Sequence, residues 1–212
     1  MRPATAFALS FLLWSQAATA SEDDAQFWAQ LTIQKPLSRT VTASVEVSPR
    51  LRSSRAGGNQ LQSRALIDLA LNDRVSIGTG LVHVSSDGPN EVRPHQQVTL
   101  FLGNLSLRTR LEERFIEGSA RMSLRVREKA TFRIPLSAAD RVNLGAEALV
   151  TLRAQSPTRP TGLDQVRLSA LLDHRFSQEL SLSGGYQLTI TPRKGLPTRI
   201  SHVPQVTLTW RP

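Results

Sequence analysis

The chain has no cysteine among its 212 residues. This absence excludes a small secreted fold held by disulfides, thiol catalysis and zinc sites built from cysteine. Long hydrophobic runs are missing too, because no segment approaches the roughly 20 apolar residues that a membrane-spanning helix needs. Aromatic residues make up only 5% of the chain, so the basic residues are not interleaved with the stacking side chains used in single-stranded nucleic-acid binding.

Positive charge is in excess, with 26 Lys and Arg against 17 Asp and Glu and a formal net charge of +9. Almost all of the basic residues are arginine. Such a balance suits acidic sugars, anionic lipids or nucleic acid. The chain has no zinc-finger spacing and no basic helix, so we expect no nucleic-acid partner.

The first 20 residues have the pattern of a secretory leader. Arg2 gives a positive start, residues 6–14 are mostly apolar, and Ala18-Thr19-Ala20 forms a small-residue cleavage site. We therefore predict a signal peptide over residues 1–20, cleaved after Ala20, and one exported domain over residues 21–212. The alternative is a retained N-terminal anchor.

The strongest pattern is an alternation of apolar and polar residues, and it is cleanest over Leu180–Thr191. Side chains of a strand point to opposite faces with a period of two, so this segment predicts a strand with one apolar and one polar face. The same pattern recurs in eleven segments, which are residues 26–35, 40–51, 60–71, 74–85, 95–102, 105–115, 119–134, 141–154, 164–175, 179–191 and 200–211. No helical period competes with them over a comparable length.

The connections between these segments alternate between short turns and longer stretches rich in Gly and Pro. Bacterial outer-membrane barrels have tight periplasmic turns and longer extracellular loops. The sequence therefore predicts an all-β fold, an antiparallel up-and-down transmembrane β-barrel of about 10–12 strands in the bacterial outer membrane. A soluble barrel with an apolar interior is the alternative.

Eleven strands raise a question of parity, because the first and last strands would then run in the same direction. Three explanations are open. The segment 26–35 lies outside the wall, one strand is misread, or the barrel closes in an unusual way. Residues 21–25 are expected to be too short to add a strand.

Charged residues follow the polar face of two neighbouring segments, 105–115 and 119–134. An arginine on the lipid face near the bilayer midplane costs about 2–4 kcal/mol, so these side chains are expected in the lumen, with Glu128 as the charged exception on the apolar face. The candidate lumen residues are Arg108, Arg110, Glu112, Arg114, Arg121, Arg125, Arg127 and Glu147. Acidic residues expected to pair with the arginines are Glu46, Asp68, Glu112, Glu147 and Asp173.

Aromatic residues gather near the ends of the predicted strands. Such positions are typical of the girdles that meet the two lipid interfaces of a barrel. The residues are Phe27, Phe115, Phe132, Phe176 and Trp210.

Three short motifs point to a family. They are Gln26-Phe27-Trp28, a stretch from Glu91 that contains Arg93 and Gln97, and the strand motif Arg-x-Arg-Leu-Glu-x-Arg-Phe over residues 108–115. Together they resemble the domain of unknown function 2490 family of small bacterial outer-membrane barrels. His95 stands where such proteins tend to have Trp, and Val92 where they tend to have His. The resemblance implies a barrel and no particular activity.

Catalytic and metal-binding patterns are weak. His83, His95 and His202 are expected toward the extracellular end, with Ser85, Ser86 and Ser201 nearby, and His174 on the apolar face near a periplasmic turn. The chain has no Gly-x-Ser-x-Gly elbow and no His-x-His pair to recommend a metal site. We expect no enzyme, no cofactor and no metal, with a rim lipid hydrolase as the remote alternative.

The function predicted from these features is a narrow, arginine-lined channel for small anions or acidic oligosaccharides. The alternative is a non-conducting structural or binding barrel whose lumen is plugged by ion pairs. The expected partners are outer-membrane lipids, the barrel-assembly machinery during biogenesis and a small anionic solute.

Overall fold

The computed structural model describes residues 21–212, and the leader prediction lies outside this range. Twelve strands and one short 3₁₀ helix, η1 (Ser54–Ala56), make up the fold. No helix within residues 21–212 is long and apolar enough to cross a membrane. The strands are β1 (Glu22–Ala25), β2 (Phe27–Pro36), β3 (Val41–Leu51), β4 (Gln60–Asn72), β5 (Val75–Ser86), β6 (Glu91–Leu102), β7 (Leu105–Ile116), β8 (Ser123–Pro135), β9 (Asp140–Arg153), β10 (Gly162–Arg175), β11 (Leu180–Thr191) and β12 (Arg199–Trp210).

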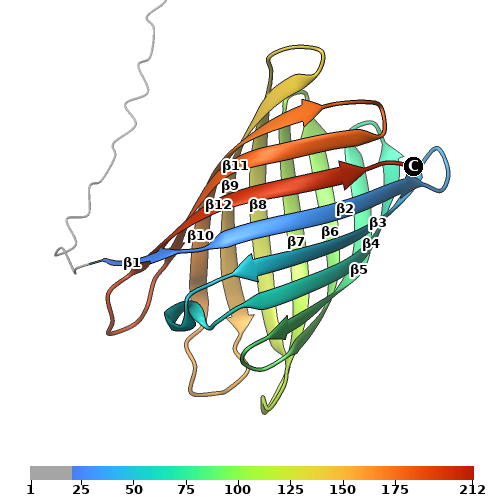
Figure 1. Ribbon diagram of the computed structural model, residues 1–212. Coiled ribbons are helices and arrows are strands. Elements are labelled where there is room, and N and C mark those ends of the chain that lie inside the picture. Colours follow the sequence, from blue (N-terminus) through green and yellow to red (C-terminus); the bar gives the residue numbers. More distant parts are fainter. Residues whose placement is uncertain (1–20) are drawn as a thin grey trace, which may run out of the picture.

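The wall is a closed, mixed barrel of 11 strands, β2 to β12 (Figure 1). Each strand pairs antiparallel with the next along the chain. The barrel closes where β12 pairs parallel with β2, from Gln205 opposite Trp28 to Trp210 opposite Ile33. The barrel prediction is confirmed, and the odd strand count is accommodated by this parallel seam rather than by a purely antiparallel wall.

β1 extends the seam. It pairs parallel with β12 from Glu22 opposite Arg199 to Ala25 opposite His202, in the same register as β2. Residues 22–33 thus run along β12 as one line, interrupted at Gln26. The expectation that residues 21–25 add no strand is wrong, because four residues suffice when they continue a pairing already set by β2.

The predicted strand boundaries hold to within one or two residues except at two places. β6 starts at Glu91 rather than at residue 95, because Pro94 is accommodated inside the strand opposite Leu81. Proline is normally confined to edges and bulges of a sheet, which is why the sequence suggested a later start. β8 starts at Ser123, since residues 119–122 belong to the loop before it.

The two ends of the barrel differ in their connections. Short turns follow β2, β4, β6, β8 and β10, whereas the connections after β3, β5, β7, β9 and β11 are longer on the whole. We call the two rims the turn end and the loop end. The predicted alternation of connections is therefore confirmed.

The two faces of the wall have opposite character. Along β7, buried Ser106, Arg110 and Glu112 alternate with outward Leu107 and Leu111. Large apolar side chains are exposed all around the outside, including the five aromatic residues named from the sequence, Phe27, Phe115, Phe132, Phe176 and Trp210. Glu128 is a polar exception on this outer face, where it accepts a 2.8 Å hydrogen bond from Thr109 Oγ1.

Candidate functional site

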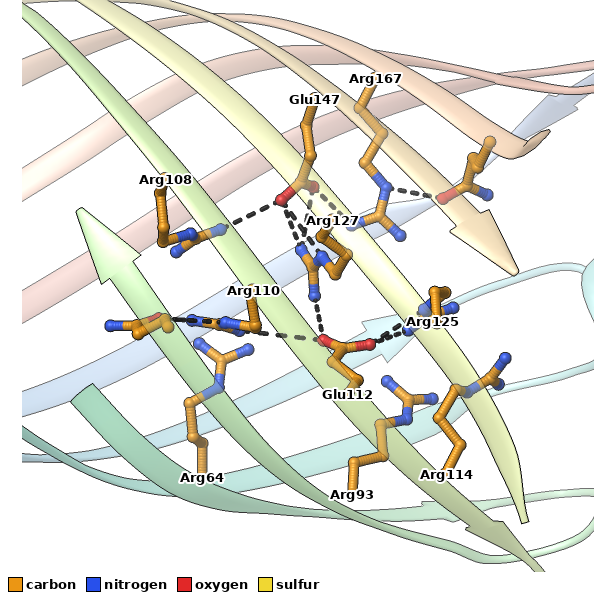
Figure 2. Close-up of polar contacts among 12 residues, drawn as sticks. Arg64, Arg93, Arg108, Arg110, Glu112, Arg114, Arg125, Arg127, Glu147 and Arg167 are labelled. Atoms are coloured by element: carbon orange, nitrogen blue, oxygen red, sulfur yellow. Dashed lines mark hydrogen bonds and ion pairs between the residues drawn. The ribbon is translucent and has the colours of Figure 1, made fainter. Parts of the chain in front are cut away.

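The lumen of the barrel is occupied by charged side chains from β7, β8 and β9. Of the eight predicted lumen residues, all but Arg121 project inward from these strands, as the alternation of buried positions requires. Figure 2 shows how Arg108, Arg125 and Arg127 converge on two carboxylates, those of Glu112 and Glu147. We call this cluster the central network; its members are Arg108, Arg110, Glu112, Arg125, Arg127, Glu147 and Arg167.

Glu112 is the first centre of this network, and its side chain is only 1% exposed. Arg125 Nε donates to its Oε2 at 2.9 Å, and Arg127 Nη1 donates to its Oε1 at 2.9 Å (Figure 2). Both arginines come from β8, which pairs with β7 so that Arg125 lies directly opposite Glu112. The carboxylate therefore has charge-assisted hydrogen bonds on both oxygens.

Glu147, on β9, is the second centre. Arg127 Nη2 reaches both of its oxygens, at 2.8 and 2.9 Å. Arg108 Nη2 donates to Oε1 at 3.1 Å, and Arg167 Nη1, from β10, donates to Oε2 at 3.3 Å (Figure 2). Two carboxylates thus tie together four neighbouring strands, β7 to β10, on their lumen side.

Arg110 extends the network toward β6 and β4. It donates to Gln97 Oε1 at 2.7 Å, and Gln97 in turn donates to Asp68 Oδ1 at 2.8 Å. Beside them His95 is fully buried, and neither ring nitrogen has a hydrogen-bond partner. Gly80 provides the space for this ring, because a Cβ there would lie 2.7 Å from His95 Cε1. At this level the lumen is packed with side chains.

The prediction for Arg121 is wrong. It lies in the loop before β8 rather than in the strand, and its Nε donates to the backbone oxygen of Ala154 at 2.8 Å. His95 was also expected near the rim, but it lies inside the barrel opposite Glu112. His174 does lie at the turn end, where its Nδ1 pairs with Asp140.

Above the central network, at the loop end, the lumen opens into a cavity of about 1310 Å³. We call it the vestibule. Its wall carries neutral polar side chains and backbone from the loops after β9 and β11. Its charged lining residues are Arg50, Arg52, Arg93, Arg114, Arg125, Arg159, Asp164, Arg167, Arg193 and Lys194.

Cations outnumber acids strongly in the vestibule. Some of them are neutralised by neighbours: Glu91 binds both Arg93 and Arg114 with closest distances of 2.6 Å, and Glu22 binds Arg193 at 2.7 Å. Within residues 21–212, four lining cations have no carboxylate within 4.0 Å, namely Arg50, Arg52, Arg159 and Lys194. Burial lowers the pKa of the Arg52 guanidinium, and the nearby Asp24 carboxylate opposes that shift.

Trp28 organises one wall of the vestibule. The guanidinium carbon of Arg50 lies 3.9 Å from the centre of its ring, and that of Arg167 lies 5.4 Å away. Gln26 Oε1 accepts the indole N–H at 3.0 Å, and Gln26 donates to Asp24 at 2.7 Å. The Gln-x-Trp motif therefore holds an aromatic platform for two arginines.

Sequence reasoning missed Arg50, Arg167 and Glu91 as site residues. Each occupies a lumen position of its strand, so the alternation alone could have placed them inside. Among residues 21–212, no group of three His, Cys, Asp or Glu side chains is arranged to hold a metal ion.

No curated protein matches the chain. A family model described as protein of unknown function (DUF2490) matches residues 25–198, which include all three motifs noted in the sequence and most of the barrel wall. The chain therefore belongs to the DUF2490 family.

Proposed function

We propose that this protein is a bacterial outer-membrane barrel that does not conduct ions and acts as a binding barrel through its loop-end vestibule. The observation that carries the proposal is the bridge formed by Arg127, which binds Glu112 and Glu147 at once. The bridge lies on the lumen side of three neighbouring strands, β7, β8 and β9, and the side chains packed around it bury Arg110, Glu112 and His95 where a pore would have to run.

Placement in the outer membrane is supported by the outer wall. Exposed Leu, Val, Ile and Phe side chains cover it, whereas soluble monomers rarely expose contiguous apolar patches above a few hundred Å². The aromatic residues at the two ends fit interfacial girdles, with the loop end outside the cell and the turn end in the periplasm. The predicted leader supplies the export that this location needs.

A plugged lumen is favoured over an open channel by the burial of the central network. Arg110 and Glu112 are each 1% exposed. A passing ion would have to break several charge-assisted hydrogen bonds, each about twice as strong as a neutral one. Barrels of eight strands are filled by side chains while those of sixteen or more carry aqueous channels, and 11 strands lie nearer the filled class.

An enzymatic role is not favoured. Ser201 Oγ donates to Asp24 Oδ2 inside the barrel, whereas the neighbouring His202 faces outward and pairs with the Tyr186 hydroxyl. Ser86 donates to the backbone oxygen of Pro89. A nucleophile and its base must be within hydrogen-bond reach, and these serines and histidines are not paired in that way.

Planar-bilayer recording of the purified barrel tests the proposal. Wild-type protein should add no steady current over the protein-free membrane. Replacing both counter-charges, Glu112→Gln with Glu147→Gln, should produce anion-selective openings, because the remaining arginines then repel one another across the lumen. The matched control replaces two acids of the outer face, Glu113→Gln with Glu128→Gln, and should stay closed.

Anion-selective current through the wild-type barrel that falls on Arg125→Ala or Arg127→Ala would overturn the proposal. It would instead establish the narrow anion channel, whose selectivity would come from the excess of arginine in the lumen.

A further inference from the structure

We propose that the vestibule is a binding site for a soluble sugar that carries two or more phosphate groups. The inference rests on the proposed function, because a closed central network makes the vestibule a pocket with a floor. It is carried by three features of this cavity: cations without counter-charges, an aromatic platform that holds two of the arginines, and a neutral polar wall.

The first feature is positive charge that no carboxylate neutralises. Four lining cations have no carboxylate within 4.0 Å in the described part of the chain, and they come from β3, its following loop and the two long loops after β9 and β11. Cations from such separate segments surround the cavity. They suit a ligand with several anionic groups rather than a single small ion, which one arginine fork would satisfy.

The second feature is how Arg50 is held. Its guanidinium stacks on Trp28, and within residues 21–212 it forms no side-chain hydrogen bond or ion pair. Its buried Nε has no partner. Stacking fixes the plane of a guanidinium while leaving its N–H edge free, whereas an ion pair would consume that edge. The edge of Arg50 is therefore available for an oxyanion.

The third feature is the rest of the lining. Amide and hydroxyl groups dominate the wall beside Trp28, and they are able to donate to and accept from sugar hydroxyls. The neutral polar lining residues include Gln60, Gln62, Thr151, Gln165, Thr189 and Thr191. A purely electrostatic anion trap would not need such groups.

Size and position limit the ligand further. The cavity of about 1310 Å³ exceeds the roughly 300–1,000 Å³ of a typical small-molecule pocket, so it has room for a mono- or disaccharide phosphate with water. The lining side chains project from the inner face of the wall. A headgroup still attached to acyl chains outside the wall would have to reach over the rim, which favours a soluble ligand.

Isothermal titration calorimetry on the folded, full-length barrel in detergent tests the site with fructose 1,6-bisphosphate as the probe. We expect saturable binding that fructose does not compete for and that inorganic phosphate competes for only weakly. Arg50→Gln should weaken binding by about tenfold or more, because one charged hydrogen-bonding group is lost. Arg74→Gln removes the same charge from an exposed turn at the opposite end and should leave affinity within about twofold.

Trp28→Leu separates stacking from charge. It keeps every cation but removes the platform, so affinity should fall although the net charge is unchanged. Near-ultraviolet circular dichroism and heat-modifiable gel mobility check that each variant is folded.

Three results would overturn the inference. The first is the absence of saturable heat with fructose 1,6-bisphosphate, and the second is an equal loss of affinity in Arg50→Gln and Arg74→Gln. The third is abolition of probe binding by vesicles of diphosphoryl lipid A in phosphatidylcholine, which would assign the site to a glycolipid headgroup. The calorimetry and the bilayer recording give separate answers. A barrel that passes no current and does not bind the probe refutes only this site. A barrel that conducts and still binds the probe refutes only the closed lumen.

Discussion

Glu112 on β7 and Glu147 on β9 are held by one guanidinium group, that of Arg127 from the strand between them. Neither carboxylate is left with water as its main partner, since both are buried. The arrangement ties three neighbouring strands together on their lumen side, so the stability of the barrel depends on individual charged side chains.

Replacing Glu112 by Gln should destabilise the barrel by about 3–5 kcal/mol, because it leaves Arg125 and Arg127 buried with reduced counter-charge. Urea titration of folding into lipid vesicles measures the change. Glu113→Gln, one residue further along β7 on the outer face, is the matched control and should shift the free energy by less than about 0.5 kcal/mol. Equal effects of the two substitutions would contradict the role of the central network.

Arginine substitutions at two depths of the outer face test whether the wall lies in lipid. Val98 is 43% exposed in the middle of β6, and Leu102 is 53% exposed at its turn end. In a bilayer Val98→Arg should cost about 2–4 kcal/mol, whereas Leu102→Arg should cost about 0–1 kcal/mol. The same urea titration in lipid vesicles measures the free-energy cost of both substitutions. Two small, similar costs would indicate a barrel whose outer wall faces water.

The parallel seam between β2 and β12 predicts a specific cross-link. Gln30 is the register partner of Thr207, and the chain has no native cysteine to interfere. The pair Gln30→Cys with Thr207→Cys should form a disulfide on mild oxidation, because register partners fall within the distance that the bond allows. Gln30→Cys with Thr209→Cys is the offset control, and its disulfide should form more slowly. Faster disulfide formation in the control than in the register pair would show that β2 and β12 pair in a different register.

Export and location form a further prediction. In a Gram-negative host the mature protein should start at Ser21 by mass spectrometry and fractionate with the outer membrane, with gel mobility that changes on heating. Recovery as a soluble periplasmic monomer would favour the soluble barrel instead.

The fold was accessible from sequence because period-two alternation is a local property. Arg108, Arg110 and Glu112 could be placed on one face by counting, and the structure confirms that face. Arg121 could not be placed reliably, because the polar pattern runs on past the strand and only tertiary pairing ends it at Ser123. β1 was missed for a related reason, since its strand conformation comes from β12 and not from its own four residues.

The vestibule was harder to predict than the network. Arg50 faces Trp28 from the next strand, β3, whereas Arg167 comes from β10 and approaches the ring only because the barrel closes. The sequence contained the motif around Trp28 but not the partners of its ring. The count of charges likewise shows an excess of arginine, but it does not show which arginines have no carboxylate partner.

The odd number of strands also decides the sidedness of the two chain ends. β1 begins at the loop end, and β12 finishes at the turn end beside the end of β2 (Figure 1). In an even-numbered barrel both ends would face one compartment. With the wall in the outer membrane, an epitope fused just ahead of Glu22 would be displayed to antibodies on intact cells, while one fused after Pro212 would be read only once the envelope is permeabilised.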